Sequence, residues 1–267
     1  MRPRALVAVG LAAALLTGCA QSVDPIERLG RKAAQRVGSY GPAGPAGAAG
    51  LPYRRWGLAA PLPAPPHRPA RPVAVDPGGP LPVVKRVPTS DKVVFLTYDD
   101  GAERDPGFVD MVRELRLPVS LFLTNTVVGP GYGHFARLQS VGASIQNHTL
   151  DHPALRGLPY PGQRAEICGQ QEKLHARFGI RPRLFRPPYG TYDTTTRRAA
   201  ADCGLAALVL WSAAVEGSAL ERPLRAGDIV SVASGESTGA SLTERTTAVL
   251  REIERRGLTV GKLENYL

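Results

Sequence analysis

The stretch VVFLTYDDG, residues 93–101, decides the fold, because a run of β-branched and aromatic residues ends in two carboxylates and a glycine. Such a run is typical of a buried strand, and the polar residues after it mark where the strand ends. Apolar residues at helical spacing follow over residues 106–115, and a second strand-like run occupies residues 119–123. A strand, a helix and a second strand in this order predict parallel β/α architecture.

The same alternation continues toward the C-terminus. We expect further strands at residues 143–147, 183–185, 206–211, 229–232 and 258–260, and further helices at residues 162–178, 194–202 and 242–256. The pattern predicts one α/β domain in which ligands bind beyond the carboxyl ends of the strands.

Polar clusters follow three of the predicted strands: Asp99 with Asp100, His148 with His152, and Arg186-Pro187-Pro188-Tyr189-Gly190. Two imidazoles four residues apart share one face if the segment turns helically, and a carboxylate can complete a three-ligand metal site. Such a site leaves positions open for water and substrate, as metal-assisted hydrolysis requires. Each cluster taken alone is better explained by a structural role, and paired aspartates at a strand end are more often a cap or a turn.

Together, the clusters resemble the first three motifs of the polysaccharide deacetylase family, also called the NodB-homology domain or carbohydrate esterase 4 family. The similarity covers most of residues 91–267. It implies a distorted (β/α) barrel, often with seven strands, that uses a divalent metal to remove acetyl groups from N-acetylated sugars. The implied metal is commonly Zn²⁺, although an Asp-His-His set also serves Co²⁺ and other divalent ions. The implied partner is a cell-wall polysaccharide or peptidoglycan-like substrate, with N-acetyl or O-acetyl groups.

The resemblance also implies a role for each residue of the clusters. Asp100, His148 and His152 would hold the metal, and Asp99 would be the general base. Arg186 would orient Asp99 and keep it ionised, and the loop at Tyr189 would offer a backbone N–H to the tetrahedral oxyanion. A carboxylate beside metal-bound water can accept the proton as the water attacks.

The later motifs depart from the family pattern. A second proton-handling histidine would fall at Ala233, and the aspartate that supports it would fall near Ala214. No histidine occurs after His175. Loss of a general acid costs about 10²- to 10⁴-fold in rate. The changes in the first motif, Tyr98 for phenylalanine and Ala102 for proline, are mild.

Three functions are therefore compatible with the sequence. In the first, the protein is a hydrolase in which Glu216 or Glu236 supplies the proton, or whose substrate has a leaving group that needs less help. In the second, it is a metal-containing pseudoenzyme that binds wall glycan. In the third, it is a scaffold with a structural metal, which would require a fourth protein ligand.

The N-terminus predicts secretion. Arg2 and Arg4 precede the apolar run Ala5 to Leu16, which is too short to span a bilayer, and Leu16-Thr17-Gly18-Cys19 resembles a bacterial lipobox. We expect a signal peptide at residues 1–18, a lipid on Cys19, and an extracytoplasmic protein anchored to the bacterial cell membrane. The alternative is an ordinary signal peptide with an incidental cysteine.

Residues 19–90 are rich in Ala, Pro, Gly and Arg, and we expect them to form a disordered tether before a folded domain at residues 91–267. The net charge of the chain is +10. Residues 91–267 hold 21 Lys and Arg against 20 Asp and Glu, so almost the whole excess lies ahead of the domain. A neutral domain argues against binding to nucleic acid, and we expect a monomer.

The remaining candidates have two readings each. Cys168 and Cys203 could form one disulfide outside the cytoplasm or remain two buried thiols. Trp211 could line an acetyl pocket or belong to the core. We expect His134 and His175 on the surface or on a helix face.

Overall fold

The computed structural model describes residues 51–65, 80–100, 105–217, 219–232 and 239–267. These residues form one compact unit, Gly50–Leu267. The predicted signal peptide and Cys19 lie outside the described residues, as do Ala102, Ala233 and Glu236.

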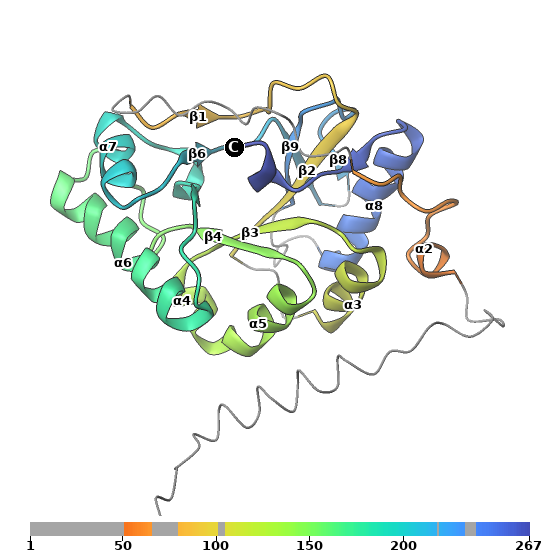
Figure 1. Ribbon diagram of the computed structural model, residues 1–267, viewed down its shortest axis with the longest axis horizontal. Helices are drawn as coiled ribbons and strands as arrows, with labels where there is room; N and C mark the ends of the chain where they lie inside the picture. Colours follow the sequence, from red (N-terminus) through yellow and green to blue (C-terminus); the bar gives the residue numbers. More distant parts are fainter. Residues whose placement is uncertain (1–50, 66–79, 101–104, 218, 233–238) are drawn as a thin grey trace, which may run out of the picture. The chain divides into compact units, whose positions relative to one another are not determined.

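A ten-stranded sheet forms the centre of the unit (Figure 1). Its strands are β1 (Val83–Val84), β2 (Val93–Asp99), β3 (Val119–Leu123), β4 (Ser144–Asn147), β5 (Leu184–Phe185), β6 (Ala207–Val209), β7 (Ala213–Glu216), β8 (Ala219–Leu220), β9 (Ile229–Val232) and β10 (Thr259–Val260). They follow the order β1-β6-β5-β4-β3-β2-β9-β7-β8, with β10 paired to β2. All pairs are parallel except the β7–β8 hairpin. The result is the predicted α/β fold, with a curled sheet that forms part of a barrel.

Helices lie outside this sheet (Figure 1). They are α2 (Pro52–Arg55), α3 (Pro106–Leu115), α4 (Asn125–Val128), α5 (Tyr132–Ser140), α6 (Tyr160–Phe178), α7 (Thr194–Asp202) and α8 (Leu242–Arg255), with short 3₁₀ turns at Gly129–Gly131, Pro188–Gly190 and Leu263–Asn265. The sequence predicted α3, α6, α7 and α8, whereas α4 and α5 were not predicted. Both histidines expected on the surface or on a helix face lie on helices: His134 is on α5 and is only 5% exposed, whereas His175 is on α6 and is exposed.

Strand register brings the polar clusters to one edge. In the parallel ladders Asp99 is opposite Phe122, Leu123 is opposite Asn147, and Asn147 is opposite Phe185. The residues that come next along these strands therefore share the carboxyl edge, where α/β proteins place their ligands. They are Asp100, Thr124, His148 and Arg186.

The folded part begins earlier than expected. Trp56 and Leu58 are 8% and 3% exposed in the main core, and the Trp56 Nε1–H donates to Glu114 on α3 at 2.8 Å. Further along, Val83 and Val84 form the strand that pairs with β6. The prediction of a disordered tether up to residue 90 is therefore wrong for residues 51–65 and 80–90, because a few large apolar side chains find partners far away in the sequence.

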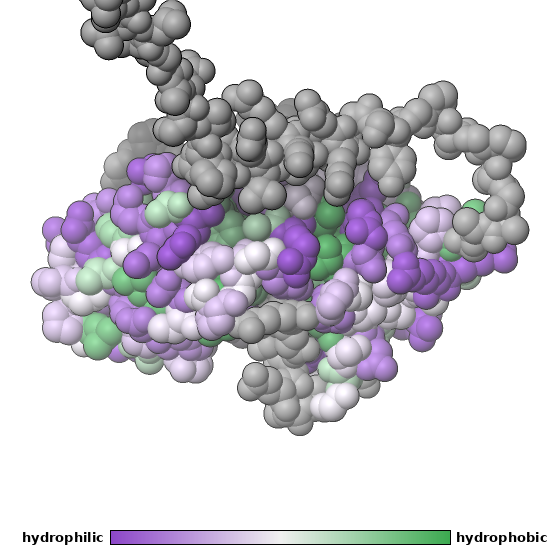
Figure 2. Space-filling model, turned by 90° about the horizontal axis from the view of Figure 1, so that it is seen from below, coloured by the Kyte–Doolittle hydropathy of each residue, from purple (hydrophilic) through white to green (hydrophobic). Residues whose placement is uncertain are grey.

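A disulfide joins Cys168 in α6 to Cys203 at the C-terminus of α7, with the two Cα atoms 5.0 Å apart. Of the two alternatives that the sequence left open, the structure has the bridge. Disulfides persist in oxidising compartments, so the bridge favours an extracytoplasmic location. Among the described helices, none is both long and apolar enough to cross a membrane. On the face shown in Figure 2, hydrophilic residues predominate on the described surface, and hydrophobic ones form small patches.

Candidate metal centre

The first ligand candidate lies just beyond β2. Asp100 has a positive φ of 43°, which turns its side chain away from the direction of the strand. Its Oδ1 accepts the backbone N–H of Thr124 at 2.6 Å. The other carboxylate oxygen, Oδ2, is therefore the one that remains for a cation.

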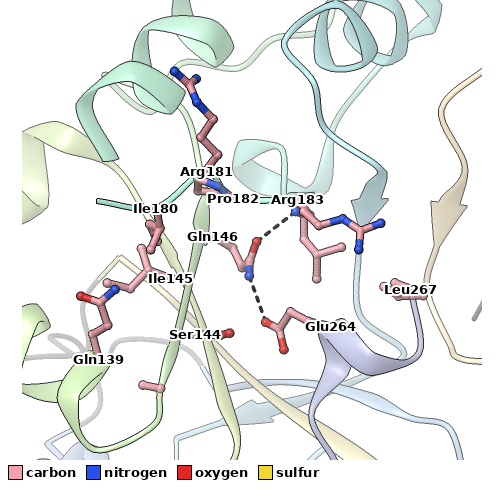
Figure 3. Close-up of a pocket in the computed structure, with 12 residues that line it drawn as sticks. Gln139, Ser144, Ile145, Gln146, Ile180, Arg181, Pro182, Arg183, Glu264 and Leu267 are labelled. Atoms are coloured by element: carbon pink, nitrogen blue, oxygen red, sulfur yellow. Dashed lines mark hydrogen bonds between the residues drawn. The ribbon is translucent and has the colours of Figure 1, made fainter. Parts of the chain in front are cut away.

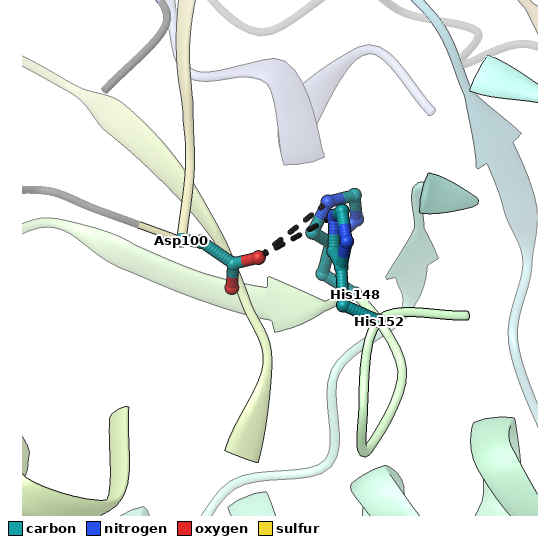
Figure 4. A group of neighbouring side chains, drawn as sticks. All are labelled: Asp100, His148 and His152. Carbon is teal, nitrogen blue, oxygen red and sulfur yellow. Dashed lines mark ion pairs between the residues drawn. The ribbon is translucent and has the colours of Figure 1, made fainter. Parts of the chain in front are cut away.

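Two imidazoles face that oxygen (Figure 4). Nε2 of His148 is 3.9 Å from Asp100 Oδ2, and Nε2 of His152 is 3.6 Å from it. One ligand atom from each of the three residues lies within 4.8 Å of the others. The structure thus brings together the three residues that the sequence assigned to the metal.

The sequence suggested that the two histidines share one face of a helical turn. In the structure this segment is not helical. The segment between them is a turn in which Thr149 and His152 have φ values of 74° and 59°. The His152 N–H donates to Thr149 Oγ1, which closes the turn. Of the five non-glycine residues with positive φ in the described chain, four surround this site: Asp100, Thr149, His152 and Tyr189. Such conformations cost free energy and concentrate at functional sites.

Arg186 is the centre of the neighbouring hydrogen-bond network. Its side chain is fully buried and donates to Asp99 Oδ1 at 2.7 Å and to Thr97 Oγ1 at 2.9 Å. It also donates to the carbonyl oxygen of Val209 at 3.3 Å and packs over the Phe122 ring at 4.2 Å from the centroid. A buried guanidinium in this position keeps the Asp99 carboxylate in one orientation.

Burial sets the protonation of the candidate ligands. It raises the pKa of Asp100 to about 7, against the effect of the hydrogen bonds from Thr124. It lowers the pKa of His148 to about 4, although the charge of Asp99 acts in the opposite direction, and it also lowers the pKa of His152. Neutral imidazoles are the form that binds metals, and a cation between the three groups would favour the ionised carboxylate.

The residues present fit a divalent ion. Metal bonds to nitrogen and carboxylate oxygen are about 2.0–2.2 Å long, so one ion can bridge atoms up to about 4.2 Å apart. Both Asp100–histidine separations are shorter than this. The side chains of Asp100 and His152 are 15% and 29% exposed, which leaves the site accessible. Within the described residues the cluster has three members, Asp100, His148 and His152.

Of the expected proton-donor positions, Ala214 lies in β7, next to β9. Ala214 in β7 is paired with Ser231 in β9, one residue before the end of that strand. Position 233 and Glu236 lie outside the described residues, and so does the side chain of Glu216. Trp211 is partly buried in two core clusters and has the Arg186 guanidinium 5.6 Å from its ring centroid.

Two residues that hydrogen-bond to the candidate site residues were not predicted. Thr124 fixes Asp100 through its backbone N–H, and its hydroxyl donates to the carbonyl oxygen of His148 at 2.8 Å. Thr97 accepts from Arg186 and donates to the Val230 carbonyl oxygen. Both could have been found from the sequence, because Thr124 directly follows a strand and Thr97 is a polar residue inside a buried one.

A separate cavity of about 260 Å³ lies where β4 and β5 begin, away from the candidate site (Figure 3). There Gln146 bridges Glu264 and the backbone N–H of Leu184. None of the candidate ligands lines this cavity.

Comparisons with known proteins agree with this site. The model of the polysaccharide deacetylase family matches residues 86–208, which include Asp99, Asp100, both histidines and the Arg186–Tyr189 loop. The chain belongs to the polysaccharide deacetylase family. The activity of the individual protein is a separate question.

Relatives that are named for an activity are less similar to this chain than an uncharacterised one. An uncharacterised protein of Streptomyces coelicolor is 62% identical over 70% of this chain and 77% of its own length. A peptidoglycan-N-acetylglucosamine deacetylase of Bacillus cereus is 24% identical over 69% of this chain and 93% of its own length. A chitin deacetylase of Cryptococcus neoformans is 31% identical over 61% of this chain, which spans only 34% of that relative's length.

The fold is shared with solved structures. One of them, described as a carbohydrate esterase 4 family pseudoenzyme from Bacillus anthracis, has a TM-score of 0.59 and 18% identity, over 68% of this chain and 67% of that chain. At this identity the likeness concerns the fold alone.

Proposed function

We propose that the protein is a metal-dependent deacetylase that removes acetyl groups from cell-wall polysaccharide. The observation that carries the proposal is the Asp100–His148–His152 cluster at an accessible strand edge, next to the Asp99–Arg186 pair. In this proposal the three-residue cluster binds the metal, and the Asp99–Arg186 pair supplies the general base. The two groups lie next to each other because they follow neighbouring strands. Relatives named for activity on peptidoglycan and chitin support a glycan substrate.

In this proposal Asp100, His148 and His152 hold the ion, which is Zn²⁺ or another divalent ion such as Co²⁺. When bound, such an ion polarises the acetyl carbonyl and lowers the pKa of its bound water. Asp99 takes the proton from the attacking water. In the described structure Arg186 donates to one carboxylate oxygen of Asp99, Oδ1, so the proton can go to the other oxygen. The backbone N–H of Tyr189 donates to the oxyanion, and Arg186 keeps the Asp99 side chain in one orientation.

A second function is favoured by one specific observation. The positions of the later motifs carry Ala214 and Ala233, and the sequence has no histidine after His175. A protein that retains the metal cluster and lacks the acid pair can bind an acetylated glycan without cleaving it. One solved structure with the same fold is described as a pseudoenzyme, so this fold is known in a protein of that kind.

The location belongs to the proposal as well. We propose a lipid on Cys19, which anchors the chain to the outer side of the cell membrane. The disulfide supports an oxidising compartment. In cells, Cys19→Ala should move the protein from the membrane fraction to the soluble fraction, and unchanged partitioning would contradict the anchor.

The deciding experiment combines metal analysis with acetate release. The full chain is dialysed, its metal content is measured, and acetate release is followed from acetylated wall glycan, chitooligosaccharide and small acetyl esters. Asp99→Asn should keep the metal and lose acetate release by about 10²- to 10⁴-fold. Asp110→Asn, a partly exposed carboxylate on α3 that pairs with Arg113, is the matched control and should change neither quantity.

Each outcome has one meaning. Release that depends on Asp99 supports the deacetylase. Bound metal with no release from any substrate, together with glycan binding, supports the second function. A chain that holds no metal would contradict both.

A further inference from the structure

One short loop, Arg186–Gly190, contacts both candidate histidine ligands at Nδ1, the ring nitrogen that does not face Asp100. The carbonyl oxygen of Arg186 is 2.7 Å from Nδ1 of His148, and the Tyr189 hydroxyl is 3.3 Å from Nδ1 of His152. The other ring nitrogens, Nε2, face Asp100 Oδ2. The same loop therefore controls the orientation of both imidazoles.

The protonation of the rings follows from this geometry. A neutral imidazole that offers Nε2 to a metal carries its proton on Nδ1. Nδ1–H of His148 then donates to the Arg186 carbonyl oxygen, and Nδ1–H of His152 donates to the Tyr189 hydroxyl oxygen. Hydrogen bonds of this kind fix the tautomer and ring orientation of metal-binding histidines.

The position of Tyr189 is not explained by burial. The residue is 66% exposed, which is unusual for a tyrosine in a short loop between core elements. Its ring meets His152 edge-on, with 4.8 Å between the ring centroids. Because the Tyr189 side chain buries little surface, its main interactions in the described structure are the ring contact and the hydrogen bond with His152.

The backbone of Tyr189 is also in a conformation that a tyrosine rarely adopts. Its φ is 59°, and Gly190 follows with a φ of 64°. At Gly190 a Cβ would lie 3.0 Å from the Trp211 ring, so the glycine is needed there. At Tyr189 a glycine would relieve strain, and yet the chain has a tyrosine.

We infer that Tyr189 is a positioning residue for the metal ligand His152 and acts through its hydroxyl group. This role rests on the proposed function, because it requires that His152 binds a metal. It is separate from the role of the Tyr189 backbone N–H at the oxyanion.

The test uses the full chain and Zn²⁺ as the probe, titrated in competition with a chromophoric chelator. Tyr189→Phe keeps the ring contact and removes the hydroxyl. Removal of such a partner costs about 10- to 100-fold in metal affinity, and the exposed site and the 3.3 Å distance place the expected loss near tenfold.

Tyr266→Phe is the matched control. It removes a hydroxyl that donates to Asp91 at 3.0 Å, at the opposite end of β2 from Asp100. Its Zn²⁺ affinity should equal that of the wild type. Tyr189→Gly removes the ring and the strain together, so it should bind Zn²⁺ at least as weakly as Tyr189→Phe while its thermal unfolding midpoint stays at or above the wild-type value.

A second readout follows the hydrogen bond itself. In the zinc-loaded protein, solvent exchange of the His152 Nδ1 proton, measured by NMR, should be faster in Tyr189→Phe than in the wild type. Tight wild-type binding of Zn²⁺ that Tyr189→Phe leaves unchanged would overturn this inference alone. A wild-type chain that does not bind Zn²⁺ would overturn the proposed function and this inference with it.

Discussion

The candidate site has two parts that differ sharply. The metal half consists of the residues at the ends of β2 to β5, and the other half consists of the positions on and after β7 and β9 where a proton donor was expected. At the ends of β2, β3, β4 and β5, short hydrogen bonds hold Asp100 to the Thr124 backbone N–H, His148 to the Arg186 carbonyl oxygen, and Asp99 to the Arg186 side chain. In β7, Ala214 lies opposite Ser231 of β9, and the sequence has no histidine after His175. The side chains that could hold a cation are therefore present without the two residues expected to deliver the proton.

This difference between the two halves has a structural reason. Asp100 depends on Thr124 after β3, His148 depends on Arg186 after β5, and Arg186 depends on Asp99 and Thr97 of β2. The contact of this network with β9 runs from Thr97 Oγ1 to a backbone carbonyl, that of Val230. A backbone carbonyl is the same whatever side chains β9 carries, so residues there can change without disturbing the metal half.

The largest expected effect comes from breaking the metal half at Arg186. Arg186→Met leaves Asp99 without its buried partner and deletes the bonds to Thr97 and Val209. Removing one member of a buried ion pair costs about 3–5 kcal/mol, and we expect a loss of this size in the free energy of unfolding. Urea denaturation at pH 7 measures it.

The matched control for this change is Arg181→Met. Arg181 pairs with Glu172 at 3.0 Å, but both side chains are more than half exposed. Exposed pairs contribute about 0–1 kcal/mol, so the control should be nearly neutral. Equal losses for the two variants would mean that the Arg186 network does not stabilise the metal half.

This network shows how far the sequence could lead. Parallel strands bring their carboxyl ends to one edge, so Asp99, Asp100, His148, His152 and Arg186 could be placed together from strand ends and motifs alone. The sequence could not give the left-handed turn that joins the two histidines, because nothing local requires a positive φ at Thr149 or His152.

Other features depended on distant partners. Trp56 lies in a segment poor in apolar residues, and it is buried because it joins a core cluster whose other members lie far along the chain, such as those of α3. The helix that carries His134 follows a Gly-Pro-Gly turn and was not predicted. Cysteine positions alone leave pairing open, so the bridge between α6 and α7 had to come from the structure.

The second effect concerns that bridge, which closes a loop containing Arg186 and Tyr189. Its cysteines are 35 residues apart. Closing a loop of this length restricts the unfolded chain by about 4 kcal/mol, so Cys168→Ser with Cys203→Ser should lower the free energy of unfolding by about 3–4 kcal/mol. Reduction of the wild type with dithiothreitol should give the same loss, and the double variant should not respond to it. A wild type that is insensitive to reduction would contradict this expectation.

The third effect would rebuild the missing half. Ala214→Asp together with Ala233→His restores the residue types that the family pattern places there. A general acid contributes about 10²- to 10⁴-fold, and a graft without its evolved surroundings should reach the lower end, about 10²-fold in acetate release. Adding Asp99→Asn to the graft should abolish the gain, because the base is then absent. No gain in a folded, metal-loaded graft would show that the two alanines are not the cause of low turnover.

The smallest expected effect comes from Asp193, which links the start of α7 to the loop that follows His152. Its Oδ1 accepts the N–H of Thr196 at 2.8 Å and caps α7, while its Oδ2 accepts the N–H of Gly157 at 2.9 Å from the loop after His152. Burial would raise its pKa, but these hydrogen bonds prevail and lower the pKa to about 2. A lowered pKa gives stability that is present above the unfolded-state value of about 3.9 and is lost as the pH falls toward about 2.

Asp193→Ala should therefore cost about 1 kcal/mol at pH 7, the usual value of an N-cap, and its deficit relative to the wild type should shrink between pH 4 and pH 2. Asp193→Asn is the matched control, because asparagine also caps helices but does not titrate. Its stability relative to the wild type should improve over the same pH interval while its capping at pH 7 is kept. The deficit of Asp193→Ala could also stay constant from pH 7 to pH 2. In that case the charge of Asp193 would not contribute to stability, and its hydrogen bonds alone would account for the loss.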